Sequence, residues 1–333
     1  MKRLLLVLAF VLLPTALFAQ VADRDVLLTP DGTLYTIESK ADTVNEANRY
    51  LTLTVTHSNK STTTSVIPDT TKGGTNWRPA LTYDADTNTL FVFWINTPNG
   101  LSSELMFTSY RDEKWQPAVG VDEQTYNLCT NLRIAVTRKV STLQKDGSYA
   151  DAPQLLVHAV WWELLGTTEH ARYAMFVIEN SKVKSYELHD LSEFGIYPDM
   201  PFTVGKDFNP EILRHPAIIE GTDSVDVLFG DVERVTMNRV TLRPIVDGRL
   251  HIPVGHRGGP PFAPPQTFSA NWTGRISTIA SGPTLVMYNV GSDTAGYVMY
   301  SNGNWSDVRT LPLNTTFSGA DAVAAITRML AQQ

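Results

Sequence analysis

The chain has 333 residues, a formal net charge of -7, a single cysteine, and 43% hydrophobic residues. This acidic balance, with no basic run to offset it, argues against nucleic acid as a partner. Cys129 has no second cysteine to pair with. Disulfide bonds within the chain are therefore excluded, and we predict that Cys129 is a small buried side chain.

Residues 1–19 have the pattern of a secretory signal peptide. Met1-Lys2-Arg3 supplies a positive start, residues 4–13 an apolar core, and residues 16–19, Ala-Leu-Phe-Ala, the expected cleavage end. The apolar run is too short for a membrane span, and no later stretch approaches the ~20 apolar residues that a span needs. We therefore expect a mature chain that begins at Gln20, has no membrane span, and is secreted or periplasmic.

Residues 20–320 are predicted to form one all-β domain built from a repeated unit. Each unit opens with an arginine and a short apolar strand, turns, and returns through a second apolar strand. The opening arginines are Arg24, Arg78, Arg133, Arg214 and Arg275. The second strands are expected at residues 34–38, 90–94, 155–162, 225–229 and 285–288. Abundant valine, threonine and aromatic residues favour strands throughout.

Two further strand-like runs follow these hairpins. They are residues 104–110 and 115–119 in the second unit, residues 296–301 and 304–308 in the fifth, and residues 50–56 and 62–67 in the first. Four antiparallel strands per unit are typical of a propeller blade, so the sequence predicts a β-propeller of about five four-stranded blades. The tail at residues 321–333 is expected to be a short amphipathic helix or the inner strand of a sixth blade.

In the outer strand pairs, residues 300–306 and 108–115 resemble degenerate copies of the Asp-box of sialidase-like propellers, whose residue order is Ser-x-Asp-x-Gly-x-x-Trp. Residues 300–306 lack its aspartate, and residues 108–115 lack its glycine. The resemblance implies a sialidase-like fold with an arginine cluster for the carboxylate of an acidic glycan. Asp23-Arg24-Asp25 with Asp31-Gly32 also resembles the first blade of five-bladed arabinan- and xylan-cleaving hydrolases, but no comparable acidic residues open the second and third blades.

Blade topology places the start of each first strand and the end of each second strand at one end of a propeller. The predicted ligand-binding residues at this rim are Arg24, Arg78, Arg133, Arg214, Arg275, Trp77, Trp94 and Trp272. A guanidinium suits a carboxylate, sulfate or phosphate, and a tryptophan suits the apolar face of a sugar. The expected partner is a glycan or a small anionic ligand, and no cofactor is expected. A structural role is the alternative, because repeated arginines could instead bridge blades through acidic side chains.

Catalysis has weaker support in the sequence. A retaining glycosidase needs two carboxyl groups about 5 Å apart, and sialidases replace one of them with a tyrosine. The candidate catalytic residues are Glu163, Asp231, Glu38 and Tyr288, but spacing along the chain does not bring them together. We therefore favour a non-catalytic binding protein and keep two alternatives, a sialidase-type glycoside hydrolase and a protein-interaction scaffold. The oligomeric state stays open.

The histidines do not indicate a metal site. His251 and His256 lie in a proline-rich stretch without further ligands beside them. His158 alternates with apolar residues within a strand, where we expect a hydrogen-bonded core histidine.

Overall fold

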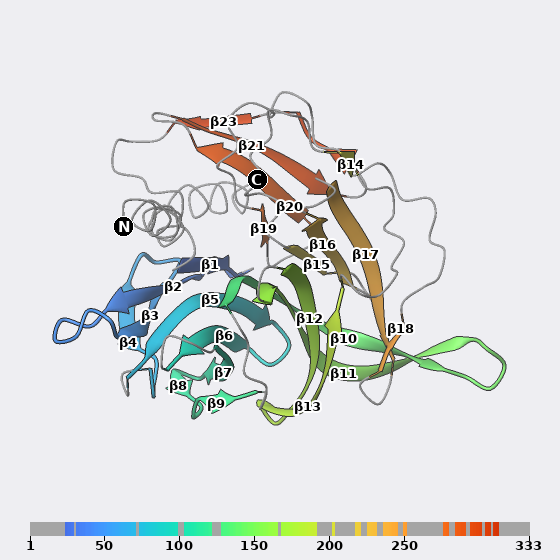
Figure 1. The fold of residues 1–333 in the computed structure, drawn as a ribbon, viewed down its shortest axis with the longest axis horizontal. Coiled ribbons are helices and arrows are strands. Elements are labelled where there is room, and N and C mark those ends of the chain that lie inside the picture. Colours follow the sequence, from blue (N-terminus) through green and yellow to red (C-terminus); the bar gives the residue numbers. More distant parts are fainter. Residues whose placement is uncertain are drawn as a thin grey trace, which may run out of the picture.

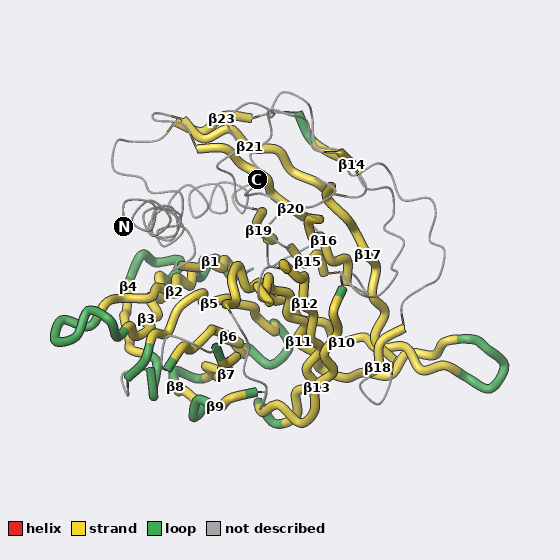
Figure 2. The backbone as a smooth tube through the Cα atoms, in the orientation of Figure 1, coloured by secondary structure: helices red, strands yellow, loops and turns green. Residues whose placement is uncertain are grey.

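The computed structural model describes residues 24–29, 31–70, 73–98, 103–121, 128–165, 168–191, 202–203, 217–220, 225–231, 236–245, 249–251, 276–279, 284–290, 294–301, 304–307 and 309–312. The regular elements among them are all β-strands (Figure 1, Figure 2). Within these ranges, no helix has the length and apolarity to cross a membrane. The predicted signal peptide, the tail at residues 321–333, and the residues Arg214, Trp272 and Arg275 lie outside them.

The strands form five units in chain order. Unit 1 comprises β1 (Arg24–Leu28), β2 (Leu34–Ala41), β3 (Arg49–Thr56) and β4 (Thr62–Val66). Unit 2 comprises β5 (Thr75–Asp84), β6 (Thr89–Thr97), β7 (Glu104–Arg111), β8 (Lys114–Trp115) and β9 (Val119–Gly120). Unit 3 comprises β10 (Leu128–Leu143), β11 (Tyr149–Leu165), β12 (Thr168–Glu179) and β13 (Lys182–Asp190). Unit 4 comprises β14 (Phe202–Thr203), β15 (Ala217–Glu220), β16 (Val225–Asp231), β17 (Thr236–Ile245) and β18 (Arg249–His251). Unit 5 comprises β19 (Ile276–Ile279), β20 (Thr284–Val290), β21 (Thr294–Ser301), β22 (Asn304–Trp305) and β23 (Arg309–Pro312).

Pairing within each unit is antiparallel. The five predicted hairpins are confirmed as the pairs β1–β2, β5–β6, β10–β11, β15–β16 and β19–β20. Among the described strands, the ladders of different units meet only at two single parallel pairs, Arg49 with Thr75 and Ser141 with Ile245. The all-β prediction is therefore confirmed for the described residues, and the two parallel pairs join units 1 and 2 into one nine-stranded sheet and units 3 and 4 into another.

Two first strands begin earlier than the sequence predicted. β5 starts at Thr75 and β10 at Leu128, so Arg78 and Arg133 lie inside their strands. One extra residue interrupts each ladder, between Trp77 and Ala80 in β5 and between Thr130 and Arg133 in β10. Such a β-bulge shifts the alternation of side chains by one position, which hides the beginning of the strand from a pattern with a period of two residues.

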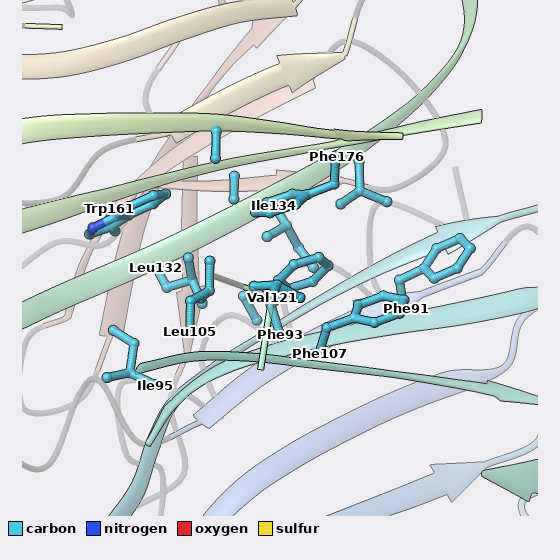
Figure 3. Packing of buried hydrophobic residues seen from close by; sticks show 14 of the residues in the cluster. Phe91, Phe93, Ile95, Leu105, Phe107, Val121, Leu132, Ile134, Trp161 and Phe176 are labelled. Atoms are coloured by element: carbon cyan, nitrogen blue, oxygen red, sulfur yellow. The ribbon is translucent and has the colours of Figure 1, made fainter. Parts of the chain in front are cut away.

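The units pack face to face. One apolar cluster joins units 1 and 2 and contains Leu53 and Trp94. A second joins units 2 and 3, where the ring centroids of Phe93 and Phe176 are 5.1 Å apart (Figure 3). A third joins units 3 and 4. Because unit 2 is covered on both faces, β6 is buried along nearly its whole length, which explains its unbroken apolar sequence.

The strands that open the five hairpins, which we call the first strands, lie side by side in successive units. β1 contacts β5, β5 contacts β10, β10 contacts β15, and β15 contacts β19. Figure 1 shows the units following one another around the view, from unit 1 in blue to unit 5 in red, with the last strands of the units toward the outside. Successive units therefore present their first strands to a common interior.

The two Asp-box-like hairpins occupy equivalent places in their units. Tyr110 pairs with Trp115 between β7 and β8 of unit 2, and Tyr300 pairs with Trp305 between β21 and β22 of unit 5. In unit 2 the turn residues Asp112 and Glu113 have φ angles of 49° and 60°, the signs required by a two-residue hairpin turn of type I′. The repeat is thus structural, whereas the sialidase-like resemblance stays a prediction.

Candidate functional site

The first strands of units 1, 2 and 3 run in the same direction. Tyr35 and Tyr83 stack across units 1 and 2 with ring centroids 6.4 Å apart, and Arg138 of unit 3 contacts Asp84 of unit 2. Tyr35 is opposite Leu27 near the end of β1, Tyr83 and Asp84 are the last residues of β5, and Arg138 lies in the second half of β10. The starts of β1, β5 and β10 therefore lie together at the opposite end, where Ser39 Oγ of unit 1 donates to the Asn76 carbonyl of unit 2 at 2.6 Å. We call this the proximal end, and the other the distal end.

Three of the predicted ligand-binding arginines lie in the proximal halves of their strands. Arg24 is opposite Glu38 in the β1–β2 ladder. Arg133 follows the bulge of β10, and its Nη1 donates to the Leu132 carbonyl at 2.6 Å. Arg78 lies in the bulge of β5 with a φ of 54°, and its side chain is buried. The structure thus brings an arginine from each of three successive units to one end of the assembly.

Arg78 has the most constrained geometry of the three. A residue before a proline normally adopts extended backbone, yet Arg78 precedes Pro79 and has a positive φ. Its Cζ lies 4.9 Å from the centroid of the Trp77 ring, within the range of a cation–π contact. The Trp77 Nε1 is buried and has no hydrogen-bond partner in the described part of the chain. This pair therefore combines a guanidinium of constrained geometry with a partly exposed tryptophan side chain.

Trp94 lies at the same end but is only 1% exposed. Its Nε1 donates to Asn76 Oδ1 at 2.8 Å. The side chain packs in the apolar cluster between units 1 and 2. Trp94 therefore joins these units in the structure and has no exposed ring face for a ligand.

Asn76 is a residue that the sequence reasoning missed. Besides accepting from Trp94, its Nδ2 donates to the carbonyls of Arg49 at 2.8 Å and Thr70 at 2.9 Å. The signal that could have found it is a local repeat, because Thr75-Asn76-Trp77-Arg78 recurs as Thr130-Asn131-Leu132-Arg133. Asn76 is the polar centre of the contact between units 1 and 2.

Glu163 belongs to a buried charged group at the proximal end of unit 3. Its Oε2 is 3.1 Å from Arg172 Nε, and Arg172 Nη1 donates to Asp190 Oδ2 at 3.0 Å. His170 Nδ1 lies 2.8 Å from the same Asp190 oxygen. We call these four residues the unit 3 charge cluster. Its guanidinium lies between the two carboxylates and contacts both of them.

The other catalytic candidates lie on strands of other units than Glu163. Glu38 lies in unit 1. Its side chain is partly exposed, and its Oε2 is 3.6 Å from Lys40 Nζ. Asp231 and Tyr288 are placed by their backbones, Asp231 at the end of β16 in unit 4 and Tyr288 within β20 in unit 5. Glu163 and Glu38 therefore lie in different units, and the side chains of Asp231 and Tyr288 lie outside the described part of the structure.

The clearest inter-unit arginine bridge is at the distal end and was not predicted. Arg138 of unit 3 donates through Nε to Asp84 Oδ1 of unit 2 at 2.7 Å, and the same Nε is 2.9 Å from Asp86 Oδ2. Burial alone would raise the pKa of Asp84, but the hydrogen bonds from Arg138 and Thr87 outweigh it and lower the pKa. Arg138 therefore bridges units 2 and 3, the structural role that is the alternative for the opening arginines.

Two predictions about single residues are confirmed. His158 is completely buried, with Nε2 2.8 Å from Thr137 Oγ1 and Nδ1 2.7 Å from Tyr173 Oη. Burial lowers the pKa of His158 to about 3. Cys129 is buried as well, and burial together with the charge of Glu163 raises the pKa of its thiol. The described residues contain no group of three or more potential metal ligands.

No family model and no curated protein matches the chain. Among solved structures, the chain is similar to a protein of unknown function from Dyadobacter fermentans, with 13% identity, a TM-score of 0.45, and coverage of 90% of this chain and 84% of that one. It is also similar to the catalytic domain of a GH62 alpha-L-arabinofuranosidase from Coprinopsis cinerea, with 13% identity, a TM-score of 0.38, and coverage of 90% and 93%. An alpha-L-arabinofuranosidase from Podospora anserina in complex with cellotriose has 11% identity, a TM-score of 0.38, and coverage of 90% and 92%. Likeness at this level assigns no function to the chain.

Proposed function

We propose that the five units are the blades of an exported, sialidase-like β-propeller, and that its proximal end binds acidic carbohydrates without cleaving them. Closure of the ring is supported by the outer face of unit 1. Val26, Leu28 and Leu34 form a buried apolar cluster there, separate from the cluster that faces unit 2. Contact with the last unit of a closed propeller would account for this burial, and closure also leaves no open sheet face at either end of the chain.

The observation that carries the ligand proposal is the Trp77–Arg78 pair. A non-glycine residue with positive φ costs of order 1–3 kcal/mol and persists only where its surroundings fix it. At Arg78 this strain orients a guanidinium that also lies over the Trp77 ring at 4.9 Å. A planar guanidinium recognises a carboxylate, sulfate or phosphate, and the partly exposed Trp77 side chain suits the apolar face of a sugar. An acidic sugar matches both features.

Binding is favoured over hydrolysis because of the unit 3 charge cluster. A glycosidase places its substrate between two carboxyl groups. Here Arg172 occupies the space between Glu163 and Asp190 and holds both as an ion-paired group. Both carboxylates are therefore already paired with a guanidinium, which disfavours them as an acid and nucleophile pair.

A screen of acidic and neutral glycans, followed by calorimetric titration of the best ligand, tests the proposal. We expect salt-sensitive binding that Arg78→Lys weakens at least tenfold, because lysine cannot reproduce a planar two-point contact. Arg111→Lys is the matched control, since Arg111 lies on an exposed turn of the same unit at the distal end and should bind as the wild type does.

Melting temperatures of both variants separate a binding defect from a folding defect. Binding of no acidic glycan, or equal binding by the wild type and a folded Arg78→Lys variant, would contradict the proposal. Turnover of a fluorogenic sialoside that disappears in a folded Glu163→Gln variant would establish the hydrolase alternative instead.

A further inference from the structure

The β3–β4 hairpin of unit 1 ends in an exposed turn. Residues 57–64 are all exposed. The turn is closed by two backbone hydrogen bonds, from His57 N to the Ser61 carbonyl at 2.9 Å and from Lys60 N to the His57 carbonyl at 2.9 Å. Lys60 has a φ of 69°. The tip is therefore an ordered turn that projects into solvent.

Asn59 and Ser61 interact within this turn. Asn59 Oδ1 accepts hydrogen bonds from the backbone N of Ser61 at 2.8 Å and from Ser61 Oγ at 2.7 Å. Both bonds use the amide oxygen, which leaves the Nδ2 amino group directed away from them on an exposed residue. Asn59-Lys60-Ser61 is also an Asn-x-Ser sequence with no proline at the middle position, the pattern of an N-glycosylation acceptor on a surface loop of a secreted protein.

We propose that Asn59 is an N-glycosylation site when the chain is exported past an oligosaccharyltransferase. The co-substrate would be an oligosaccharide linked through a diphosphate to a lipid. In the transfer, the bond between the sugar anomeric carbon and the phosphate oxygen breaks, a bond from that carbon to Asn59 Nδ2 forms, the Nδ2 loses a proton, and the lipid diphosphate leaves. This inference rests on the export part of the proposed function.

The hairpin position suits this modification. β3 runs from Arg49, whose guanidinium bonds to Ser39 at the proximal end, to Thr56, which pairs with Leu34 at the distal end. The tip therefore lies at the distal end, away from the Trp77–Arg78 pair. A glycan on Asn59 would extend into solvent without displacing a buried side chain and without covering the proposed ligand site.

A second Asn-x-Ser sequence provides a contrast within the same chain. In Asn304-Trp305-Ser306 the asparagine lies within β22 and pairs with Ser301, and Ser306 Oγ donates to the Asp307 carbonyl. Asn304 is thus part of a sheet ladder rather than the tip of a turn. Two Asn-x-Thr sequences, at Asn271 and Asn314, lie outside the described residues.

The test is expression of the full chain in a eukaryotic secretory host, with peptide mapping of the secreted protein before and after enzymatic deglycosylation. We expect an intact glycan on the Asn59 peptide, and conversion of Asn59 to aspartate when the glycan is removed. Asn59→Gln and Ser61→Ala should each abolish the modification of this peptide, Ser61→Thr should retain it, and Asn304→Gln should leave it unchanged.

Secreted protein whose Asn59 peptide is unmodified would overturn the proposal. If the native leader fails to direct secretion, the export proposal fails by itself. The same peptide mapping on residues 20–333 behind a host leader then still shows whether Asn59 is glycosylated. Glycan-binding titrations on the same samples report separately on the proximal site, because the two sites lie at opposite ends of the units.

Discussion

At the scale of single residues, the polar contacts between units depend on a few fully hydrogen-bonded side chains. Asn76 uses both its oxygen and its amino group, and it joins Arg49 and Thr70 of the first unit and its following loop to Trp94 of the second. A buried amide of this kind contributes little when all its bonds are made, but its loss leaves several buried partners without bonds.

Asn76→Ala should therefore destabilise the protein by about 2–5 kcal/mol, because two carbonyls and the Trp94 indole lose their partner in a buried place. Asn96→Ala is the matched control. Asn96 is opposite Asn76 in the β5–β6 ladder, but its Oδ1 has no hydrogen-bond partner in the described part of the chain. Urea unfolding measures both, and equal losses of stability would contradict the central role of Asn76.

His158 makes stability depend on pH. Burial lowers its pKa to about 3, whereas an unfolded histidine titrates near 6.5, so the unfolded state takes up a proton that the folded state does not bind. The stabilising contribution is fully present above about pH 6.5 and is lost as the pH falls toward 3. From pH 7 to pH 5, the free energy of unfolding should drop by about 2 kcal/mol through this residue.

The control for this dependence is His158→Gln, which can still bond to Thr137 and Tyr173 but does not titrate. Its free energy of unfolding should fall less between the same two pH values than that of the wild type. Parallel pH profiles of the two proteins would show that His158 is not the titrating group.

At the scale of elements, the contact between units 2 and 3 is secured at the distal end by Arg138. The Asp84 side chain is 4% exposed, whereas those of Arg138 and Asp86 are 37% and 70% exposed. Removing Arg138 would leave the buried carboxylate without its main partner, while removing Asp86 would delete only a solvent-screened contact.

We therefore expect Arg138→Ala to cost about 2–3 kcal/mol, less than the roughly 3–5 kcal/mol for a fully buried pair, because solvent screens the guanidinium. Asp86→Ala should change stability by less than about 1 kcal/mol. Thermal unfolding of both variants measures the difference. A similar small shift in both would mean that the Asp84 pair does not hold the units together.

The elements were predictable from the sequence where hydrophobic runs and turn residues agree. All five hairpins follow from apolar runs separated by turn sequences. In units 2 and 3 these runs are nearly continuous, because both faces of these units are buried. The bulges beside Arg78 and Arg133 could not be found in this way, since one inserted residue changes the register without changing composition.

Side-chain roles at the candidate site were only partly predictable. The arginines of units 1 to 3 could be assigned to one end from the order of the strands. The burial of Trp94 and the bridging role of Arg138 depend on contacts between sheets far apart in sequence, and no local pattern records these contacts.

At the scale of the whole molecule, stability comes from sheet-on-sheet packing without disulfides. Cys129 is the single cysteine and is buried. We therefore expect the melting temperature to be the same with and without a thiol reductant. The signal-peptide pattern of residues 1–19 separately predicts that mass spectrometry of exported protein finds Gln20 at its N-terminus. A lower melting temperature in reductant would indicate that chains are linked to each other through Cys129.

The central claim is that the proximal end binds an acidic sugar through Arg78. A crystal structure of the protein with the tightest-binding acidic glycan tests this claim most directly. The predicted result is a ligand at the proximal end, with its acidic group within hydrogen-bond distance of the Arg78 guanidinium and the apolar face of its sugar ring against Trp77. A ligand bound at the distal end or on an outer strand, with Arg78 held only by protein groups, would contradict the claim.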